Sequence, residues 1–146
     1  MSRKKAIIVF LLLAAIVAAY IGYREYNRTN VDLSVVEADL TVEAGELIRE
    51  FETNDTLANN KYLNKILSVS GNIKQIDTTD DHYTIILGDT TAMSSVRCSL
   101  DSNYRSGISG LKPGTKIKVK GAITGFKKDD LGIGSDIELN RCIIEK

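Results

Sequence analysis

The clearest pattern in the chain is a strand-like alternation over residues 66–76, whose centre, VSGNI at 69–73, returns as VKGAI at 119–123. In both copies β-branched residues alternate with polar or small ones, which is the period of a β-strand. Each copy has a glycine in its middle, Gly71 and Gly121. Strands carry a central glycine mainly where the backbone bends or is closely approached. The repeat therefore predicts two equivalent strands of a small closed barrel, which needs bends of this kind.

Three further strands complete the predicted sheet. The second copy extends over 116–126, and three other segments, 83–87, 95–100 and 137–144, have strand-like composition. In the strand 95–100 one face carries Val96, Cys98 and Leu100, and the other carries Arg97 and Ser99. The connector 101–110, between the third and fourth strands, has two glycines and room for one helical turn. Five strands with this connector predict a mainly β protein, a five-stranded OB-fold barrel.

The spacing becomes helical before the first strand. Thr41 is placed to cap a helix whose first turns contain Glu43 and Glu46, where carboxylates complement the helix dipole. The apolar residues of the following segment recur at three- to four-residue steps: Leu47, Ile48, Phe51, Ala58 and Tyr62. We expect an amphipathic helix with an irregularity near 54–56. Its acidic face is interpreted as a solvated surface over a packed stripe rather than as a cation site.

The amino-terminal residues 6–21 are apolar without interruption and follow the basic run 3–5. This predicts a retained transmembrane anchor over 6–23, with Tyr20, Tyr23 and Tyr26 suited to the membrane interface. A cleaved signal peptide is the alternative, with Val17 and Ala19 before the cleavage site, although the apolar run continues past it. The positive-inside bias places residues 1–5 in the cytoplasm.

The predicted organisation is therefore a cytoplasmic amino terminus (1–5), an anchor (6–23), a tether (24–40) and a helix with an OB-fold domain (41–146). The expected location is the inner membrane, single-pass, with the carboxyl-terminal domain in the periplasm or otherwise outside the cytoplasm. The chain has 146 residues and a formal net charge of zero, but residues 31–146 carry fourteen basic and eighteen acidic side chains. A net charge of −4 argues against a protein that binds phosphate backbones through clustered Lys and Arg.

Candidate chemistry is sparse. His82 is the only histidine and lies in or beside a polar turn, so a solvent-exposed loop histidine is favoured over a metal ligand. The order of Asp129, Asp130 and Asp136 does not match a calcium loop. No serine or cysteine has a visible base, because a second histidine and a G-x-S-x-G elbow are lacking. The sequence predicts no enzyme, no cofactor and no metal.

Cys98 and Cys142 lie on the predicted third and fifth strands, which are neighbours in OB topology. In an exported domain this pair is a candidate disulfide. In the cytosol the same pair would be two small buried apolar side chains.

Several local sequences resemble the tRNA-anticodon-like OB-fold family. These are YLNK at 62–65 leading into VSG, the triplet VRC at 96–98, LKPG at 111–114 before VKG, and the closing CII at 142–144. The resemblance covers roughly residues 40–146 and includes the preceding helix. It implies an OB fold and a bacterial protein of a mostly uncharacterised family, often attached to membranes. The likeness to anticodon-binding domains is one of fold, which does not transfer function.

Three functions are compared. The first is a membrane-anchored binding module of the bacterial envelope, non-catalytic, that holds a protein, peptide or glycan partner. The alternative is an oligonucleotide-binding OB domain, which needs a basic groove with stacking aromatic rings. The candidate binding face for either function consists of Tyr83, Arg97, Lys116, Lys118 and Lys120. The three lysines alternate on one strand and are equally explained as a solvated face that discourages edge pairing. The third function, an envelope hydrolase, lacks any catalytic constellation.

Overall fold

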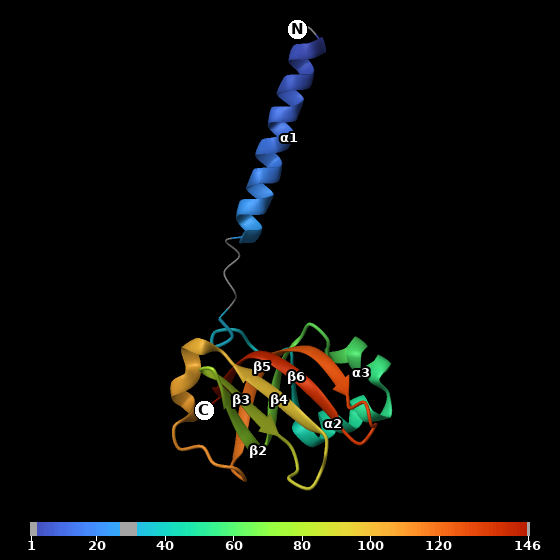
Figure 1. Cartoon of the computed structure of the whole chain (residues 1–146), viewed down its shortest axis with the longest axis vertical. Coiled ribbons are helices and arrows are strands. Elements are labelled where there is room, and N and C mark those ends of the chain that lie inside the picture. The colour runs from blue at the N-terminus through green and yellow to red at the C-terminus, as the bar shows by residue number, and fades with distance from the viewer. Residues whose placement is uncertain (1–2, 27–31, 146) are drawn as a thin grey trace. The chain divides into compact units, whose positions relative to one another are not determined.

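The computed structural model describes residues 3–26 and 32–145 and divides the chain into two units, Met1–Val31 and Asp32–Lys146. The first unit is one helix, α1 (Arg3–Tyr26), shown in Figure 1. Its segment Ile7–Tyr26 is 20 residues long, is apolar enough to cross a membrane, and contains no buried residue. A helix of this length and composition near an amino terminus serves either as a membrane anchor or as a signal sequence.

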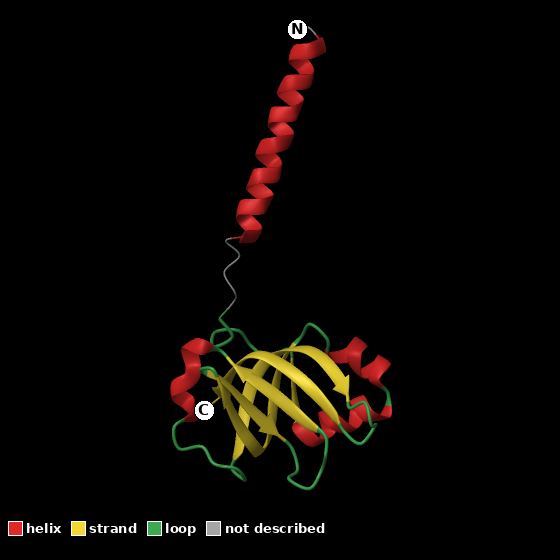
Figure 2. Cartoon of the chain, viewed as in Figure 1, coloured by secondary structure: helices red, strands yellow, loops and turns green. Residues whose placement is uncertain are grey.

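The second unit is a closed sheet with two α-helices and one 3-10 helix (Figure 2). The order of its elements is β1 (Leu40–Glu43), α2 (Ala44–Thr53), α3 (Asp55–Tyr62), β2 (Ile66–Thr79), β3 (His82–Leu87), β4 (Ser95–Leu100), the 3-10 helix η1 (Ser102–Ile108), β5 (Lys116–Lys128) and β6 (Ser135–Glu145). The strand order is β1-β2-β3-β4-β6-β5, and pairing of β2 with β5 closes the ring. The five strands β2 to β6 confirm the five predicted from the sequence.

The long strand β2 closes the ring because its two halves pair with different neighbours. Residues 66–72 pair with β5, and residues 73–79 pair with β3. Gly71 lies where β2 changes partners, and a Cβ added there would lie 2.9 Å from the Cβ of Ala44. The absence of a side chain thus lets the start of α2 pack directly on the strand, as expected for a mid-strand glycine.

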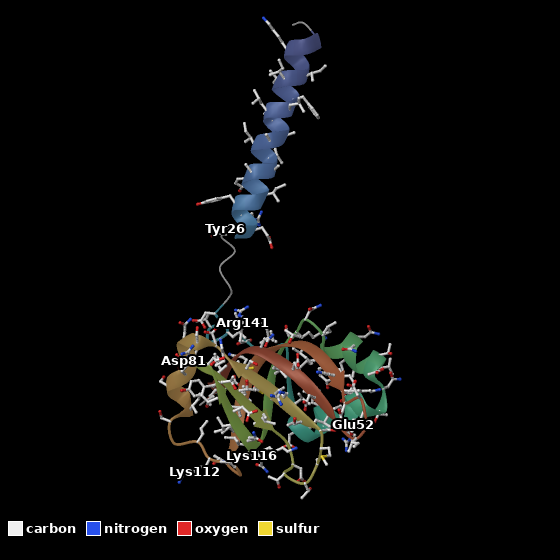
Figure 3. The ribbon with its side chains drawn as sticks, in the orientation of Figure 1. Tyr26, Glu52, Asp81, Lys112, Lys116 and Arg141 are labelled. Atoms are coloured by element: carbon white, nitrogen blue, oxygen red, sulfur yellow. The ribbon has the colours of Figure 1, made fainter. Side chains whose placement is uncertain are left out.

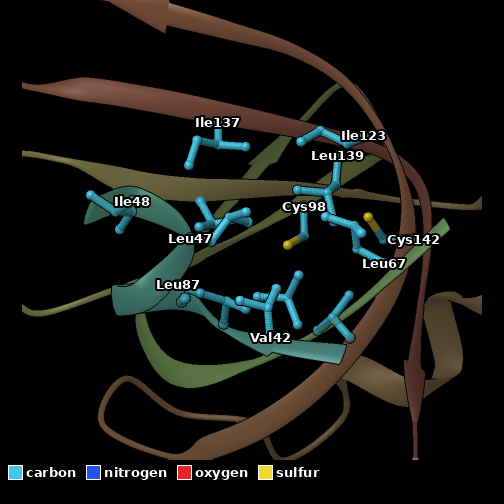
Figure 4. Packing of buried hydrophobic residues seen from close by; sticks show 14 of the residues in the cluster. Val42, Leu47, Ile48, Leu67, Leu87, Cys98, Ile123, Ile137, Leu139 and Cys142 are labelled. Carbon is cyan, nitrogen blue, oxygen red and sulfur yellow. The ribbon is translucent and has the colours of Figure 1, made fainter. Parts of the chain in front are cut away.

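The core fills the space between the inward faces of the strands and helix α2 (Figure 4). Residues that alternate along the strands, such as Ile85 and Leu87 on β3, are fully buried. From α2, Phe51 stacks on Phe126 of β5 with ring centroids 4.8 Å apart, and on Tyr62 of α3 at 6.0 Å. The amphipathic stripe predicted for residues 47–62 is therefore the surface that α2 and α3 bury against the sheet.

The predicted helix start was wrong. Thr41 does not cap a helix but lies in β1, which pairs in parallel with β2. Helix α2 begins at Ala44, and its N-cap residue, Glu43, makes no side-chain capping hydrogen bond. The predicted irregularity near 54–56 is confirmed, because Asn54 ends α2 and its side chain caps α3 by accepting from the amide of Leu57 at 3.0 Å. The predicted helical turn in the connector is confirmed as η1.

Candidate functional site

The predicted lysine row lies on the outward face of β5, and each of its side chains already has a partner. Lys116 pairs with Glu43 at 2.9 Å, and Lys118 pairs with Glu145 at 3.7 Å. Lys120, only 7% exposed, pairs with the same Glu145 at 3.7 Å. Because carboxylates from β1 and β6 face the lysines, the row presents much less positive charge to a ligand than its sequence suggests.

Part of this face is covered by residues 32–39, which the sequence analysis assigned to the tether. Lys120 donates a hydrogen bond of 2.8 Å to the carbonyl oxygen of Val36, and Leu33 is 4% exposed. At the start of the segment, Tyr104 of η1 donates its hydroxyl to the Asp32 carboxylate at 2.8 Å. The backbone amide of Ser34 also donates to Asp32, and these hydrogen bonds, the amide first, lower the pKa of the Asp32 carboxyl. We call residues 32–39 the strap.

Arg97 and Tyr83 do not join the lysine row. Arg97 lies on the outward face of β4 between two carboxylates, Asp77 at 3.6 Å and Asp136 at 3.9 Å. Tyr83 shares its side of β3 with Ile85 and is half-buried. The three lysines thus form one row on β5, whereas Tyr83 lies on β3 and Arg97 on β4.

The surface on which OB folds usually hold ligands is formed by the second and third barrel strands and the loops after the first and fourth. In this chain these are β3, β4, the turn at 80–81 and the loop 129–134. Besides the carboxylates around Arg97, this region contains Asp81 in the turn and Asp129 in the loop. Figure 3 shows Asp81 beside η1, far from Glu52 at the end covered by α2. Asp81 is paired with Arg105 of η1 at 3.9 Å, as Asp77 and Asp136 are with Arg97, and these carboxylates oppose the binding of a phosphate backbone.

Two neighbouring loops expose an apolar cluster that sequence reasoning missed. Met93, in the loop between β3 and β4, is 70% exposed, and Leu131 and Ile133, in the loop 129–134, are 77% and 58% exposed. The loops touch, because a Cβ added to Gly134 would lie 2.9 Å from the Cβ of Met93. A cavity of about 330 Å³ lies beside them. We call Met93, Leu131 and Ile133 the loop patch; isolated apolar residues in a glycine- and aspartate-rich loop were its only sequence signal.

Cys98 and Cys142 are both fully buried and are free thiols in this structure. They belong to neighbouring strands, β4 and β6, and to the same core cluster (Figure 4). Burial, with the nearby Cys98 thiol as the second cause, raises the pKa of the Cys142 thiol well above its usual value. A thiol held in its neutral form is unreactive as a nucleophile in the folded domain. The predicted disulfide remains a prediction.

The remaining polar candidates do not assemble into a reactive centre. Within residues 3–26 and 32–145, no group of three or more His, Cys, Asp or Glu side chains is placed to hold a metal ion. His82 is exposed at the start of β3. The buried hydroxyls of Ser94 and Ser135 both contact the carboxylate of Glu52, which ties α2 to the ends of β4 and β6.

Comparison with solved structures supports the fold. A lipoprotein from Klebsiella pneumoniae, whose name assigns it provisionally to nucleic-acid binding, is 17% identical, with a TM-score of 0.55 over 72% of this chain and 91% of that one. The asparaginyl-tRNA synthetase from Pyrococcus horikoshii is 11% identical, with a TM-score of 0.41 over 59% of this chain and 21% of that one. No match was found among curated proteins.

A family model settles the classification. The model named tRNA_anti-like matches residues 1–133, which is most of the chain. The OB fold that this family name implies agrees with the strand topology described above. The chain therefore belongs to the tRNA_anti-like family.

Proposed function

We propose that this chain is a single-pass, membrane-anchored OB-fold binding module of the bacterial cell envelope, without catalytic activity. The observation that carries the proposal is helix α1, in which the 20-residue, predominantly apolar segment Ile7–Tyr26 has no buried residue. Such a helix is stable in the hydrocarbon of a bilayer and costly to expose to water. The basic run at residues 3–5 favours a cytoplasmic amino terminus and a domain outside the cytoplasm.

A protein, peptide or glycan partner fits the surface of the domain better than a nucleic acid does. The lysines of β5 are paired with carboxylates, and Arg97 lies between two aspartates. The loop patch, in contrast, exposes three large apolar side chains on adjacent loops. Apolar side chains exposed together on adjacent loops suit a protein interaction site.

Membrane retention tests the anchor directly. Full-length chain produced in a bacterial cell should remain in the membrane pellet after an alkaline carbonate wash, at its full mass. Ile16→Arg, which places a charge in the middle of the apolar helix, should release a large fraction of it. Val35→Arg is the matched control, because Val35 is an exposed residue of the strap. Recovery of a shortened, soluble species from the unaltered chain would establish a cleaved signal sequence and contradict the anchor.

Oligonucleotide binding is the second candidate, and the name of the Klebsiella neighbour is what favours it. Fluorescence anisotropy of a labelled single strand, titrated with detergent-solubilised full-length chain at two salt concentrations, tests it. With about two or three phosphates neutralised, and a slope of about −0.7 per contact, binding should be weaker than micromolar and quickly screened by salt. Tight binding that is lost in a folded variant with alanine at Lys116, Lys118 and Lys120 would make the lysine row the site.

A further inference from the structure

We propose that Cys98 and Cys142 form a disulfide that fastens the last strand, β6, to β4 when the domain folds outside the cytoplasm. The claim that the domain folds outside the cytoplasm rests on the proposed function, whereas the ability of the two cysteines to form the bond rests on the fold alone. The two strands are parallel neighbours, with Cys98 opposite Leu139 and Leu100 opposite Cys142. Both cysteines are fully buried, so their side chains face the same interior.

A β-bulge brings Cys142 to that interior. Leu139 and Cys142 are both buried although they are three positions apart, whereas side chains of a regular strand reach the same face only at even separations. The pairing of β4 with β6 shifts at this point, so that three residues of β6 pass two of β4. Arg141, inside the bulge, has the left-handed φ of 56° that residues other than glycine rarely adopt. The bulge thus turns the side chain of Cys142 toward the interior of the sheet.

The strand on the other side of β6 is adapted to the same sulfur. Gly121 of β5 lies opposite the bulge, where the pairing of β5 with β6 also shifts. A Cβ added at Gly121 would collide with the Sγ atom of Cys142. Cys142 therefore reaches the interior that Cys98 also faces, and the missing side chain of Gly121 leaves room there for its sulfur.

The bond has to form before β6 docks, because both thiols are inaccessible in the folded domain. The chemistry is an exchange with an oxidant of the disulfide class, either enzyme-borne or small. One cysteine thiolate attacks a sulfur of the oxidant, giving a mixed disulfide and expelling one thiolate of the oxidant. The second cysteine thiolate then displaces the other oxidant sulfur. The chain loses two electrons and two protons, and the oxidant takes up both and leaves as two thiols, which are on one molecule if the oxidant is an enzyme. The loop closed by the bond includes η1 and β5.

Refolding of purified full-length chain in detergent with a glutathione redox buffer tests the bond independently of the compartment. After acid quenching and denaturation, a bulky maleimide should label no cysteine before reduction and both afterwards, and the chain should run as a monomer without reductant. Reductant should lower the melting temperature of the refolded chain by roughly 10–20 °C. Reductant should not change the melting temperature of a Cys98→Ala/Cys142→Ala double variant. Labelling of both thiols without reductant, or a bond between two chains, would overturn the proposal.

The same trapping on cells separates the two proposals. If the chain isolated from cells contains the Cys98–Cys142 disulfide, both the bond and the extracytoplasmic location are supported. Chain that is bridged after refolding but reduced in cells would support the bond and contradict the extracytoplasmic location. Chain that stays reduced after refolding overturns the bond, whatever its location in cells.

Discussion

Val69 of β2 lies directly opposite Val119 of β5, so the two copies of the repeated motif are antiparallel neighbours in the closed sheet. This register places Gly71 opposite Ile117, and Gly121 opposite Leu67. Each glycine makes room for a side chain from another element, the methyl group of Ala44 at Gly71 and the sulfur of Cys142 at Gly121. The two glycines thus serve packing of the helix on one side of the pairing and of β6 on the other.

Replacing Gly71 by valine should lower the free energy of unfolding by about 1–3 kcal/mol, because its Cβ has no room beside Ala44. Urea unfolding of the detergent-solubilised chain, followed by circular dichroism, measures the change. Gly45→Ala is the control: a Cβ there meets nothing within 4 Å, and alanine favours a helix, so stability should stay equal or rise by about 0.5 kcal/mol. Equal midpoints for Gly71→Val and the unaltered chain would refute the close approach.

Replacing Gly121 by alanine should be destabilising through its collision with Cys142, and truncation of that sulfur should relieve part of the cost. In a double-mutant cycle under reducing conditions, Gly121→Ala should cost at least about 1 kcal/mol less in the Cys142→Ala background than alone. Some cost should remain, because the added Cβ also lies 3.3 Å from the Cβ of Leu139. Strict additivity would show that the sulfur does not lie against Gly121.

The lysines of β5 should differ sharply in their contribution to stability. Lys120→Met removes one of the two lysine partners of Glu145 and the donor to the Val36 carbonyl at a buried position, and should cost about 1–3 kcal/mol. Lys116→Met breaks an ion pair in which both side chains are mostly exposed, and should change the free energy of unfolding by less than about 0.5 kcal/mol. The same urea titration compares them, and equal costs would contradict the different burial of the two pairs.

Docking of the strap should depend on pH through Asp32. Hydrogen bonds from Ser34 and Tyr104 lower the pKa of this carboxyl below its usual value of 3.8. A group whose pKa is lowered by folding stabilises the docked form above its unfolded pKa, and that stabilisation is lost as the pH falls through the folded pKa. Hydrogen exchange of amides 33–38 should therefore become less protected, relative to the core, below about pH 4. Tyr104→Phe should reduce this pH dependence. If the pH dependence of exchange in this variant is unchanged, the hydrogen bond from Tyr104 to Asp32 does not control docking of the strap.

Local patterns in the sequence were sufficient to predict the five strands β2 to β6. Period-two alternation marks β2 and β5, and the division of 95–100 into an inward face with Cys98 and an outward face with Arg97 agrees with their burial. The repeat was informative because a glycine between β-branched residues has few explanations in a strand.

Features that depend on distant parts of the chain could not be predicted. The four-residue strand β1 forms only by parallel pairing with β2, and helix-capping residues within it suggested a different element. The lysine row looked like a basic face because its partners, Glu43 and Glu145, are far away in sequence. The bulge at Arg141 has no local sequence signal, since left-handed backbone is usually marked by glycine or asparagine.

The orientation of the domain tests the central claim, an anchored binding module outside the cytoplasm, most directly. The full-length chain should be fused at its carboxyl end either to a phosphatase that is active only outside the cytoplasm or to a fluorescent protein that matures only inside it. The account predicts phosphatase activity without fluorescence, and a shift toward fluorescence when Arg3, Lys4 and Lys5 are changed to glutamate, because these residues set the orientation. Fluorescence without phosphatase activity in the unaltered chain would contradict the account.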